Sequence, residues 1–257
     1  MSIALADVHV SVPFQGAKIP ILKGVSLKIP VGARIGILGL PKSGKTTLLR
    51  TICGTVTADL GRVERTSRTS WPIPLTTFLA DPATVARNVR FLATLYGISD
   101  ENFPNRIAEM VGISEFLNVP LQKCPKFVKP RLAFGLGVGI SFDTYLFDGS
   151  ITPGDKEFKV RAAEIIAERL NGCAYVVATA NPKEPEQFCD SVYVLDAGQA
   201  RYFGAVAEGV EYFKELLAAQ KQKTEAAKEA SVAQESDEEI EGPGDIDVLA
   251  AAISDEV

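Results

Sequence analysis

Histidine is nearly absent from this chain of 257 residues, since His9 is the only one. It lies in an alternating run, ALADVHVSV, which is typical of a strand. A mechanism that needs a histidine anywhere else is therefore excluded. Cysteine is also scarce, and no two cysteines have the C-x-x-C spacing of a zinc or redox site. We expect reduced thiols and no zinc centre from these four residues: Cys53, Cys124, Cys173 and Cys189.

Long hydrophobic runs are missing too. The longest apolar stretch without a charge, LAFGLGVGISF at residues 132–142, is about half the length that a membrane-spanning helix needs, and it contains three glycines. The N-terminus has no basic segment followed by an apolar one, which a secretory signal would require. We therefore expect a cytoplasmic protein that reaches a membrane only through a partner.

Basic residues are absent from the C-terminal end. From Glu235 onward there are nine acidic residues and no Lys or Arg, so the preceding part carries a net charge of +4 within a total of −5. No basic stripe with interleaved aromatic residues occurs, which argues against a nucleic-acid partner. Residues 221–257 are expected to form an acidic tail, helical at first and then disordered. A docking helix at 245–254 is the alternative for its last part, because apolar residues there share one helical face.

The most informative stretch that is present is GLPKSGKTTLLR, residues 39–50, which fits the phosphate-binding pattern G-x-x-x-x-G-K-[ST]. An apolar run at 33–39 predicts the buried strand before it, and residues 45–53 predict the helix after it, ended by Gly54. Backbone amides and the helix N-terminus would hold phosphate oxygens, Lys45 would reach the β- and γ-phosphates, and Thr46 would bind Mg²⁺. The predicted nucleotide-binding residues are Gly39, Leu40, Pro41, Lys42, Ser43, Gly44, Lys45, Thr46 and Thr47.

Strands and helices alternate around this loop. Residues 2–39 have β patterns, and further apolar strands are predicted at 144–148 and 174–180, with a hairpin at 191–204 that turns at Ala197-Gly198. An amphipathic helix is expected at 155–172, ended by Gly172, and another of about fifteen residues from Ala205. The pattern predicts an α/β fold of the P-loop NTPase type, with an N-terminal antiparallel β part, a largely parallel core sheet and an inserted helical subdomain at about 80–142. The domain is expected to cover residues 1–220.

The order of these segments resembles the ATP-binding domain of ABC transporters over residues 2 to about 217. Within that family it is most similar to the subfamily that exports capsular and other cell-surface polysaccharides. The resemblance rests on LKGVSLKIPVGARIGILG, SWPIPL (70–75), NVRFLATLYG (88–97), RLAFGL (131–136), TPGDKEF (152–158) and QFCDSVYVLDAGQARYFG (187–204).

This resemblance implies ATP and Mg²⁺ as ligands and an integral-membrane permease as partner. It implies a position on the inner face of the cell membrane through that permease. ABC domains pair head to tail, so a homodimer or a heterodimer with a paralogue is expected. The family's Mg²⁺-ordering acid falls on Asp148, which together with Thr46 would bind Mg²⁺. The aspartate of the family's D-loop falls on Asp155.

Several of the family's other functional positions are altered. The glutamate that polarises the attacking water is Gly149 here, and the switch histidine is Ala180, so no catalytic residue is intact. Ser150 is no substitute for the glutamate, because an alcohol is a poor base near neutral pH. The signature Ser-Gly pair, which closes over the γ-phosphate of the opposite subunit, is replaced by Lys126-Phe127, and Pro130 suggests that the next helix starts later than in the family.

Two recognition positions also differ. The glutamine that links Mg²⁺ to the permease is Leu79, within a segment, residues 78–89, that the resemblance makes the permease-docking region. The aromatic residue that stacks on adenine falls on Val12, with Phe14 close by.

Three hypotheses remain open. The first is a degenerate ABC subunit that binds ATP–Mg²⁺, hydrolyses it poorly and acts as a structural or regulatory component of polysaccharide export. The second is a working exporter ATPase whose missing groups come from an intact paralogue, or from Lys126 or Lys129. The third, a P-loop kinase or GTPase, is disfavoured because the chain lacks the guanine-recognition motif N-K-x-D and because the ABC-like stretches would be unexplained.

Overall fold

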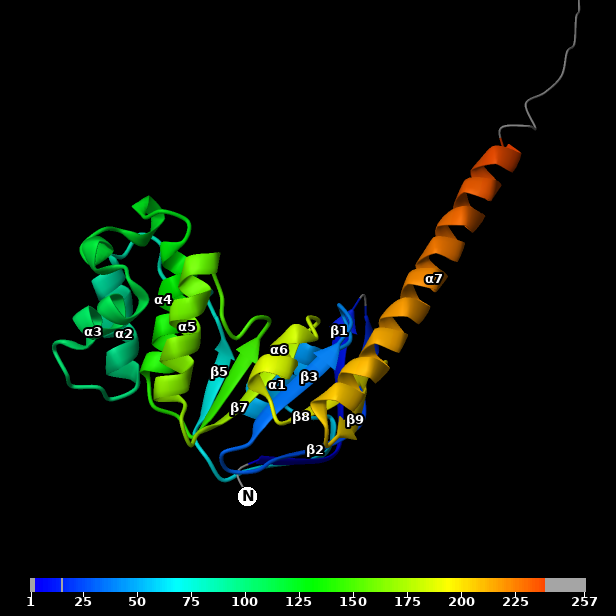
Figure 1. The fold of residues 1–257 in the computed structure, drawn as a ribbon, viewed down its shortest axis with the longest axis horizontal. Helices are drawn as coiled ribbons and strands as arrows, with labels where there is room; N and C mark the ends of the chain where they lie inside the picture. The colour runs from blue at the N-terminus through cyan, green and yellow to red at the C-terminus, as the bar shows by residue number, and fades with distance from the viewer. Residues whose placement is uncertain (1–2, 15, 239–257) are drawn as a thin grey trace, which may run out of the picture. The chain divides into compact units, whose positions relative to one another are not determined.

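The computed structural model describes residues 3–14 and 16–238 (Figure 1). One compact unit ends at Phe213, and a second begins at Lys214. The site described below lies wholly in the first unit.

The first unit is built on two sheets. The larger has the strand order β5 (Thr69–Ile73), β6 (Thr144–Asp148), β7 (Ala174–Thr179), β3 (Arg34–Gly39), β8 (Ser191–Asp196) and β9 (Gln199–Phe203). Its first five strands are parallel, and β9 is antiparallel to β8. The smaller sheet is antiparallel, with the order β2 (Ala17–Ile29), β1 (Ile3–Phe14) and β4 (Leu60–Arg65). This arrangement confirms the predicted α/β class with an antiparallel part and a largely parallel core sheet.

Apolar layers cover both faces of the large sheet. Along β6, Tyr145 and Phe147 face one hydrophobic cluster while Leu146 faces the other, as the period of two in a strand requires. Helix α1 (Lys45–Cys53) packs in the second cluster through residues such as Leu48, between the two sheets. Both faces are therefore buried, which explains why β6 and β7 are continuous apolar runs in the sequence.

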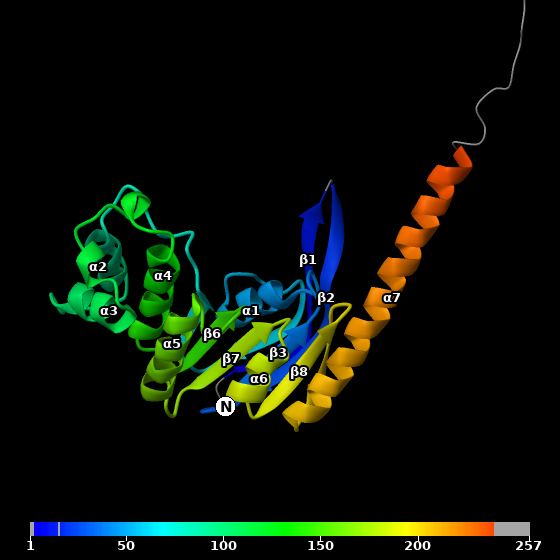
Figure 2. The same cartoon turned by 45° about the horizontal axis from the view of Figure 1, so that its top comes forward.

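The helical block lies beside β5 at one edge of the large sheet (Figures 1 and 2). It contains α2 (Val85–Leu95), α3 (Phe103–Val111), α4 (Val128–Gly139) and two 3₁₀ turns, η1 (Ser114–Phe116) and η2 (Leu121–Lys123). Helix α5 (Lys156–Arg169) packs into the same hydrophobic cluster. The predicted helical character of this region is confirmed.

Helix α4 accounts for the glycine-rich apolar run. A Cβ on Gly135 would lie 2.7 Å from a Val111 methyl, and a Cβ on Gly137 would lie 2.6 Å from Ile73. The glycines therefore let α3 and β5 approach the α4 backbone closely. Over the residues that the structure describes, no helix is long and apolar enough to cross a membrane.

Two helix ends differ from the predictions, while the predicted hairpin turn is confirmed. Helix α5 ends at Arg169 with its C-cap at Leu170, so Gly172 lies beyond the cap rather than forming it. Helix α7 spans Val206–Glu238, 33 residues, so the predicted helix of about fifteen residues and the predicted helical start of the tail form one helix, because no glycine or proline interrupts it after Gly209. The candidate docking helix at 245–254 lies outside the described residues.

Strands β8 and β9 turn through Ala197 and Gly198, both with positive φ, as a tight hairpin requires.

Candidate functional site

The predicted phosphate loop joins the carboxyl end of β3 to the N-terminus of α1. Gly44 has φ +101°, a conformation that L residues rarely adopt, and a Cβ there would lie 2.9 Å from Ile21. A Cβ on Gly39 would lie 2.8 Å from the carbonyl oxygen of Leu195. Both glycines of the motif are thus required by the packing of the loop itself, and they keep its backbone free of side chains on these sides.

Lys45 lies folded along this loop. Its ammonium donates to the carbonyl oxygens of Gly39, at 2.8 Å, and Leu40, at 2.7 Å. The third donor has only the Ser43 hydroxyl, at 3.5 Å. Partial burial lowers the pKa of Lys45, and the nearby carboxylate of Asp148 opposes that shift. The cation is therefore held against the loop, where added anionic oxygens would offset its desolvation.

Thr46 and Asp148 come together from distant parts of the chain. Thr46 is the second residue of α1 and Asp148 the last residue of β6, and the threonine hydroxyl donates to the carboxylate at 2.7 Å. A hydroxyl and a carboxylate are hard oxygen ligands of the kind that Mg²⁺ prefers, usually with phosphate and water completing the shell. The donor set fits the predicted Mg²⁺, and these two residues would hold it.

The position after Asp148 has no side chain and an unusual backbone. Gly149 has φ +105°, and its amide donates to the carbonyl oxygen of Ala178 at 2.8 Å. Apart from the chain neighbours Asp148 and Ser150, no residue has a heavy atom within 4 Å of the point where a Cβ would stand. Ala180, exposed just beyond the end of β7, also lacks a polar side chain. Neither position offers a group that could orient water.

A carboxylate that the sequence patterns did not reveal lies next to this position. Glu184, in the short helix α6 (Lys183–Phe188), is only 9% exposed. It accepts a hydrogen bond from the Ser150 hydroxyl at 2.6 Å and another from the Ile151 amide at 3.2 Å. Within residues 3–14 and 16–222 it is the only buried carboxylate. No spacing in the sequence links positions 150 and 184, because only the pairing of β6 with β7 brings them together.

The altered signature segment lies directly before α4. This helix begins at Val128, immediately after Lys126-Phe127, with Pro130 as its third residue. Pro130 therefore lies in the first turn, as predicted, because a proline there lacks only an amide that would have no helical partner. That this helix starts later than in the family stays a prediction. Lys129 forms an ion pair with Asp81 at 2.7 Å, so its ammonium is already engaged.

The same helix is tied to the segment that follows Asp148. Arg131 donates to the carboxylate of Asp155 at 2.9 Å, and its guanidinium lies 4.7 Å from the Phe127 ring and 4.6 Å from the Phe158 ring. The pKa of Asp155 is lowered, first by the hydrogen bond from the Phe158 amide and then by the one from Arg131. Asp155 is also the N-cap of α5, so one carboxylate joins α4, α5 and the segment after β6.

The two altered recognition positions have different surroundings. Leu79 is 6% exposed and belongs to the hydrophobic cluster of the helical block. Its side chain is therefore a packing element. Val12 and Phe14 lie near the end of β1 and are 37% and 57% exposed, so apolar surface is available there.

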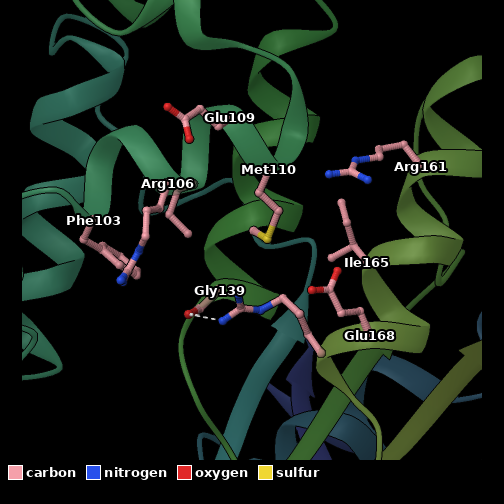
Figure 3. Close-up of a pocket in the computed structure, with 10 residues that line it drawn as sticks. Phe103, Arg106, Glu109, Met110, Gly139, Arg161, Ile165 and Glu168 are labelled. Carbon is pink, nitrogen blue, oxygen red and sulfur yellow. Dashed lines mark hydrogen bonds between the residues drawn. The ribbon is translucent and has the colours of Figure 1, made fainter.

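A cavity of about 330 Å³ lies elsewhere, between α3, the end of α4 and α5 (Figure 3). Its arginines already have partners: Arg106 pairs with Asp100, Arg161 pairs with Glu164, and Arg169 donates to the last carbonyl groups of α4. The lining residues are Phe103, Arg106, Ile107, Glu109, Met110, Gly139, Arg161, Ile165, Glu168 and Arg169. We assign this cavity a structural role, since its charges are of both signs and largely satisfied.

Comparisons with known proteins agree with this geometry. The ABC transporter family model matches residues 22–126. The chain is 28% identical to the ATP-binding protein BexA of Haemophilus influenzae, over 76% of this chain and 90% of BexA. It is 29% identical to the capsule polysaccharide export ATP-binding protein CtrD of Neisseria meningitidis, over 76% of this chain and 91% of CtrD. A dimeric post-hydrolysis structure of the ATP-binding cassette MJ0796, bound to ADP and phosphate, superposes with a TM-score of 0.69 at 18% identity, over 79% of this chain and 98% of that one, and shows the same fold.

Proposed function

We propose that the chain is the ATP-binding subunit of a polysaccharide export system of the ABC transporter type, because the ABC transporter family model matches residues 22–126 and the similarity to BexA and CtrD extends over 76% of the chain. The observation that carries the proposal is the juxtaposition of Thr46 and Asp148 beside Lys45 in an intact phosphate loop. The polysaccharide cargo is inferred from the relatives, of which CtrD is named for capsule polysaccharide export and KpsT of Escherichia coli for polysialic acid transport.

The ligand of this subunit is ATP with Mg²⁺. Loop amides and the N-terminus of α1 bind phosphate oxygens, and Lys45 neutralises their charge. Thr46 and Asp148 hold the metal, which supplies charge neutralisation on the phosphates when it is bound.

Hydrolysis by this subunit is slow. In phosphoryl transfer the protein contributes positioning and electrostatics, and a residue that orients the water is a recurring component. Gly149 and Ala180 provide no such group, and Lys126-Phe127 stands where a Ser-Gly pair would contact the opposite nucleotide. Loss of a general base alone costs about 10²- to 10⁴-fold in rate. The subunit therefore acts mainly as a structural or regulatory partner.

The second candidate is an active exporter ATPase formed with an intact paralogue. It is favoured by the intact Lys45, Thr46 and Asp148 set, which would face a normal signature in a heterodimer. Supply of a missing group by Lys129 is less favoured, because its ammonium is paired with Asp81. A homodimer would leave both sites without the missing groups.

ATP binding and phosphate release by the purified protein test this function. We expect Mg²⁺-dependent ATP binding and turnover far below the 1–100 s⁻¹ that is typical of kinases. Turnover in that range by the chain alone would contradict the proposal that this subunit hydrolyses ATP poorly. A large increase on adding a co-purifying paralogue would instead select the heterodimer.

We propose that residues 78–89 contact the permease. Arg87 is exposed on α2, while its neighbours Asn88 and Val89 are buried. The change Arg87→Glu should weaken recruitment to membranes that contain the permease, whereas Arg62→Glu, on β4, should leave it unchanged. Equal recruitment of wild type and Arg87→Glu would argue against docking there.

A further inference from the structure

We propose that the slow hydrolysis passes its proton through Ser150 to the buried carboxylate of Glu184. This inference rests on the proposed function, because it requires ATP in the phosphate loop. It gives Ser150 a catalytic role and makes Glu184 the residue that acts through it.

The Ser150 hydroxyl has the geometry of a relay. Its oxygen lies 2.6 Å from Glu184 Oε1 and 3.0 Å from the carbonyl oxygen of Thr152, but a hydroxyl has one proton to donate. The carboxylate is the closer and stronger acceptor, since a charged partner makes shorter hydrogen bonds. The Thr152 amide donates weakly to the same oxygen, at 3.3 Å. One acceptor site of Ser150 therefore remains for a water proton.

Ser150 also lies close to the predicted Mg²⁺ site. It follows Asp148 by two residues, and two residues of chain span at most about 7 Å. The amide of Gly149 bonds to Ala178 and so fixes this segment against the end of β7. Apart from its chain neighbours Asp148 and Ser150, no residue has a heavy atom within 4 Å of the point where a Cβ of Gly149 would stand, so this side of the segment is open to water.

The burial of Glu184 needs an explanation that packing alone does not give. A buried carboxylate is costly unless hydrogen bonds compensate it, and an apolar residue at this position would avoid that cost. The two hydrogen bonds of Glu184 go to Ser150 and to the adjacent Ile151 amide. Both therefore bind the segment that follows Asp148, and the charge is directed at the one hydroxyl next to the altered catalytic position.

The proposed step is balanced as follows. The water oxygen forms a bond to the γ-phosphorus while the bond from that phosphorus to the bridging oxygen of the β-phosphate breaks, which releases ADP. One water proton passes to Ser150 Oγ as the serine proton passes to Glu184 Oε1, and the reverse transfer then delivers the proton to solvent. An alcohol alone is a poor base, but here the carboxylate is the final acceptor. The extra transfer also explains why the rate would be low.

Single-turnover hydrolysis with protein in excess over Mg²⁺–ATP tests the relay. Ser150→Ala and Glu184→Gln should each lower the rate about 100-fold, within the range for a lost general base. The double variant should lose little more, because the two residues act as one unit. Ser150→Thr, which keeps the hydroxyl, should stay within about threefold of wild type. The matched controls Ser99→Ala and Glu168→Gln, at exposed positions, should match wild type.

Three further measurements separate the relay from a structural role. ATP affinity should be unchanged in Ser150→Ala, and the melting temperature should fall by only several degrees, since Glu184 loses one of its two hydrogen bonds. The solvent deuterium isotope effect should be smaller in Ser150→Ala than in wild type, since one proton in transit is removed. If Glu184→Gln fails to fold, the Ala and Thr changes at Ser150 still decide the question.

The failures are distinguishable. Unchanged turnover in Ser150→Ala, with ATP binding intact, would overturn the relay and leave the proposed function standing. If wild type binds ATP but turns it over no faster than Lys45→Ala does, the relay is overturned and the proposed function stands. If wild type shows no Lys45-dependent ATP binding, the proposed function fails and the relay fails with it.

Discussion

Two groups of residues lie at the carboxyl ends of the parallel strands. The retained set, which is proposed to hold a nucleotide, consists of Lys45, Thr46 and Asp148; the altered set, at the positions proposed for cleavage, consists of Gly149 and Ala180. The two sets differ in whether their side chains are polar. Thr46 donates to Asp148 at 2.7 Å, and Lys45 donates to the loop carbonyl oxygens of Gly39 and Leu40 at 2.8 and 2.7 Å. One residue beyond Asp148, Gly149 has no side chain and a backbone that few other residues adopt. Gly149 follows Asp148 directly at the end of β6, so what this position lacks is a side chain and not a place beside the loop. A phosphate loop alone therefore predicts binding and says little about turnover.

The largest expected effect is on ATP affinity, when Lys45 of the retained set is replaced. Lys45→Ala should weaken Mg²⁺–ATP binding by about 100-fold or more, because hydrogen bonds to charged groups contribute about 1.5–3 kcal/mol each and Lys45 is predicted to reach two phosphates. Equilibrium binding by calorimetry or a fluorescent nucleotide measures this change.

Lys42→Ala is the comparison within the same loop, since the side chain of Lys42 is exposed and the backbone amide, which is its predicted contribution to phosphate binding, is kept in the variant. It should change ATP affinity by less than about threefold. Equal losses in the two variants would mean that general positive charge, and not the geometry of Lys45, holds the phosphates.

The next effect tests whether the altered set can be repaired. Gly149→Glu has room for its side chain, but φ +105° is strained for any L residue. Such strain costs about 1–3 kcal/mol, and each kcal/mol lowers the melting temperature of a domain of this size by about 2–4 °C. We expect a destabilised protein whose turnover stays near background when it is assayed alone.

Gly149→Ala separates the two causes, because it carries the backbone strain without the carboxylate. The two variants should melt at similar temperatures below wild type. Restored turnover in Gly149→Glu, with a wild-type melting temperature, would show that the backbone relaxes freely and that the glutamate alone was missing.

Local sequence signals predicted most of the fold. The strand, loop and helix at residues 33–54 were placed correctly because glycine punctuation and apolar runs are local. Strands β4 and β5 were not placed from their patterns, since β4 has almost no buried residues and β5 contains a proline. The continuity of α7 beyond residue 220 was not predicted, because its polar residues there lack a periodic apolar face.

The site could be predicted only where its residues belong to a sequence motif. Asp148 was paired with Thr46 from the resemblance, and the structure brings them together. Glu184 was missed because its partner, Ser150, is 34 residues away and no motif joins them. Long-range contacts of this kind depend on strand order, which periodicity does not reveal.

A smaller effect concerns Asp155, a retained residue at the far end of the altered segment. Its lowered pKa means that its stabilising contribution is present above the ordinary pKa of about 3.9 and is lost as pH falls through the lower folded value. Arg131→Gln should raise the pKa of Asp155 part of the way to normal, because the Phe158 amide remains. Carboxyl NMR titration measures the shift. The pKa of Asp190, lowered mainly by Arg34, should not move, and an unshifted Asp155 would show that Arg131 contributes little.

The smallest effect concerns the base of the nucleotide. Val12 and Phe14 are two residues apart on β1 and so share one face, and Ile19, the cross-strand partner of Val12, is 41% exposed. These side chains offer an apolar surface but no hydrogen bond to a base edge. Stacking tolerates any base, since every base has a π-face. The Kd values for ATP and GTP should therefore agree within about threefold, and Phe14→Ala should weaken both by the same factor. A preference for ATP above about 30-fold would require a polar group that reads the adenine edge, and the base site would then not be among the altered positions.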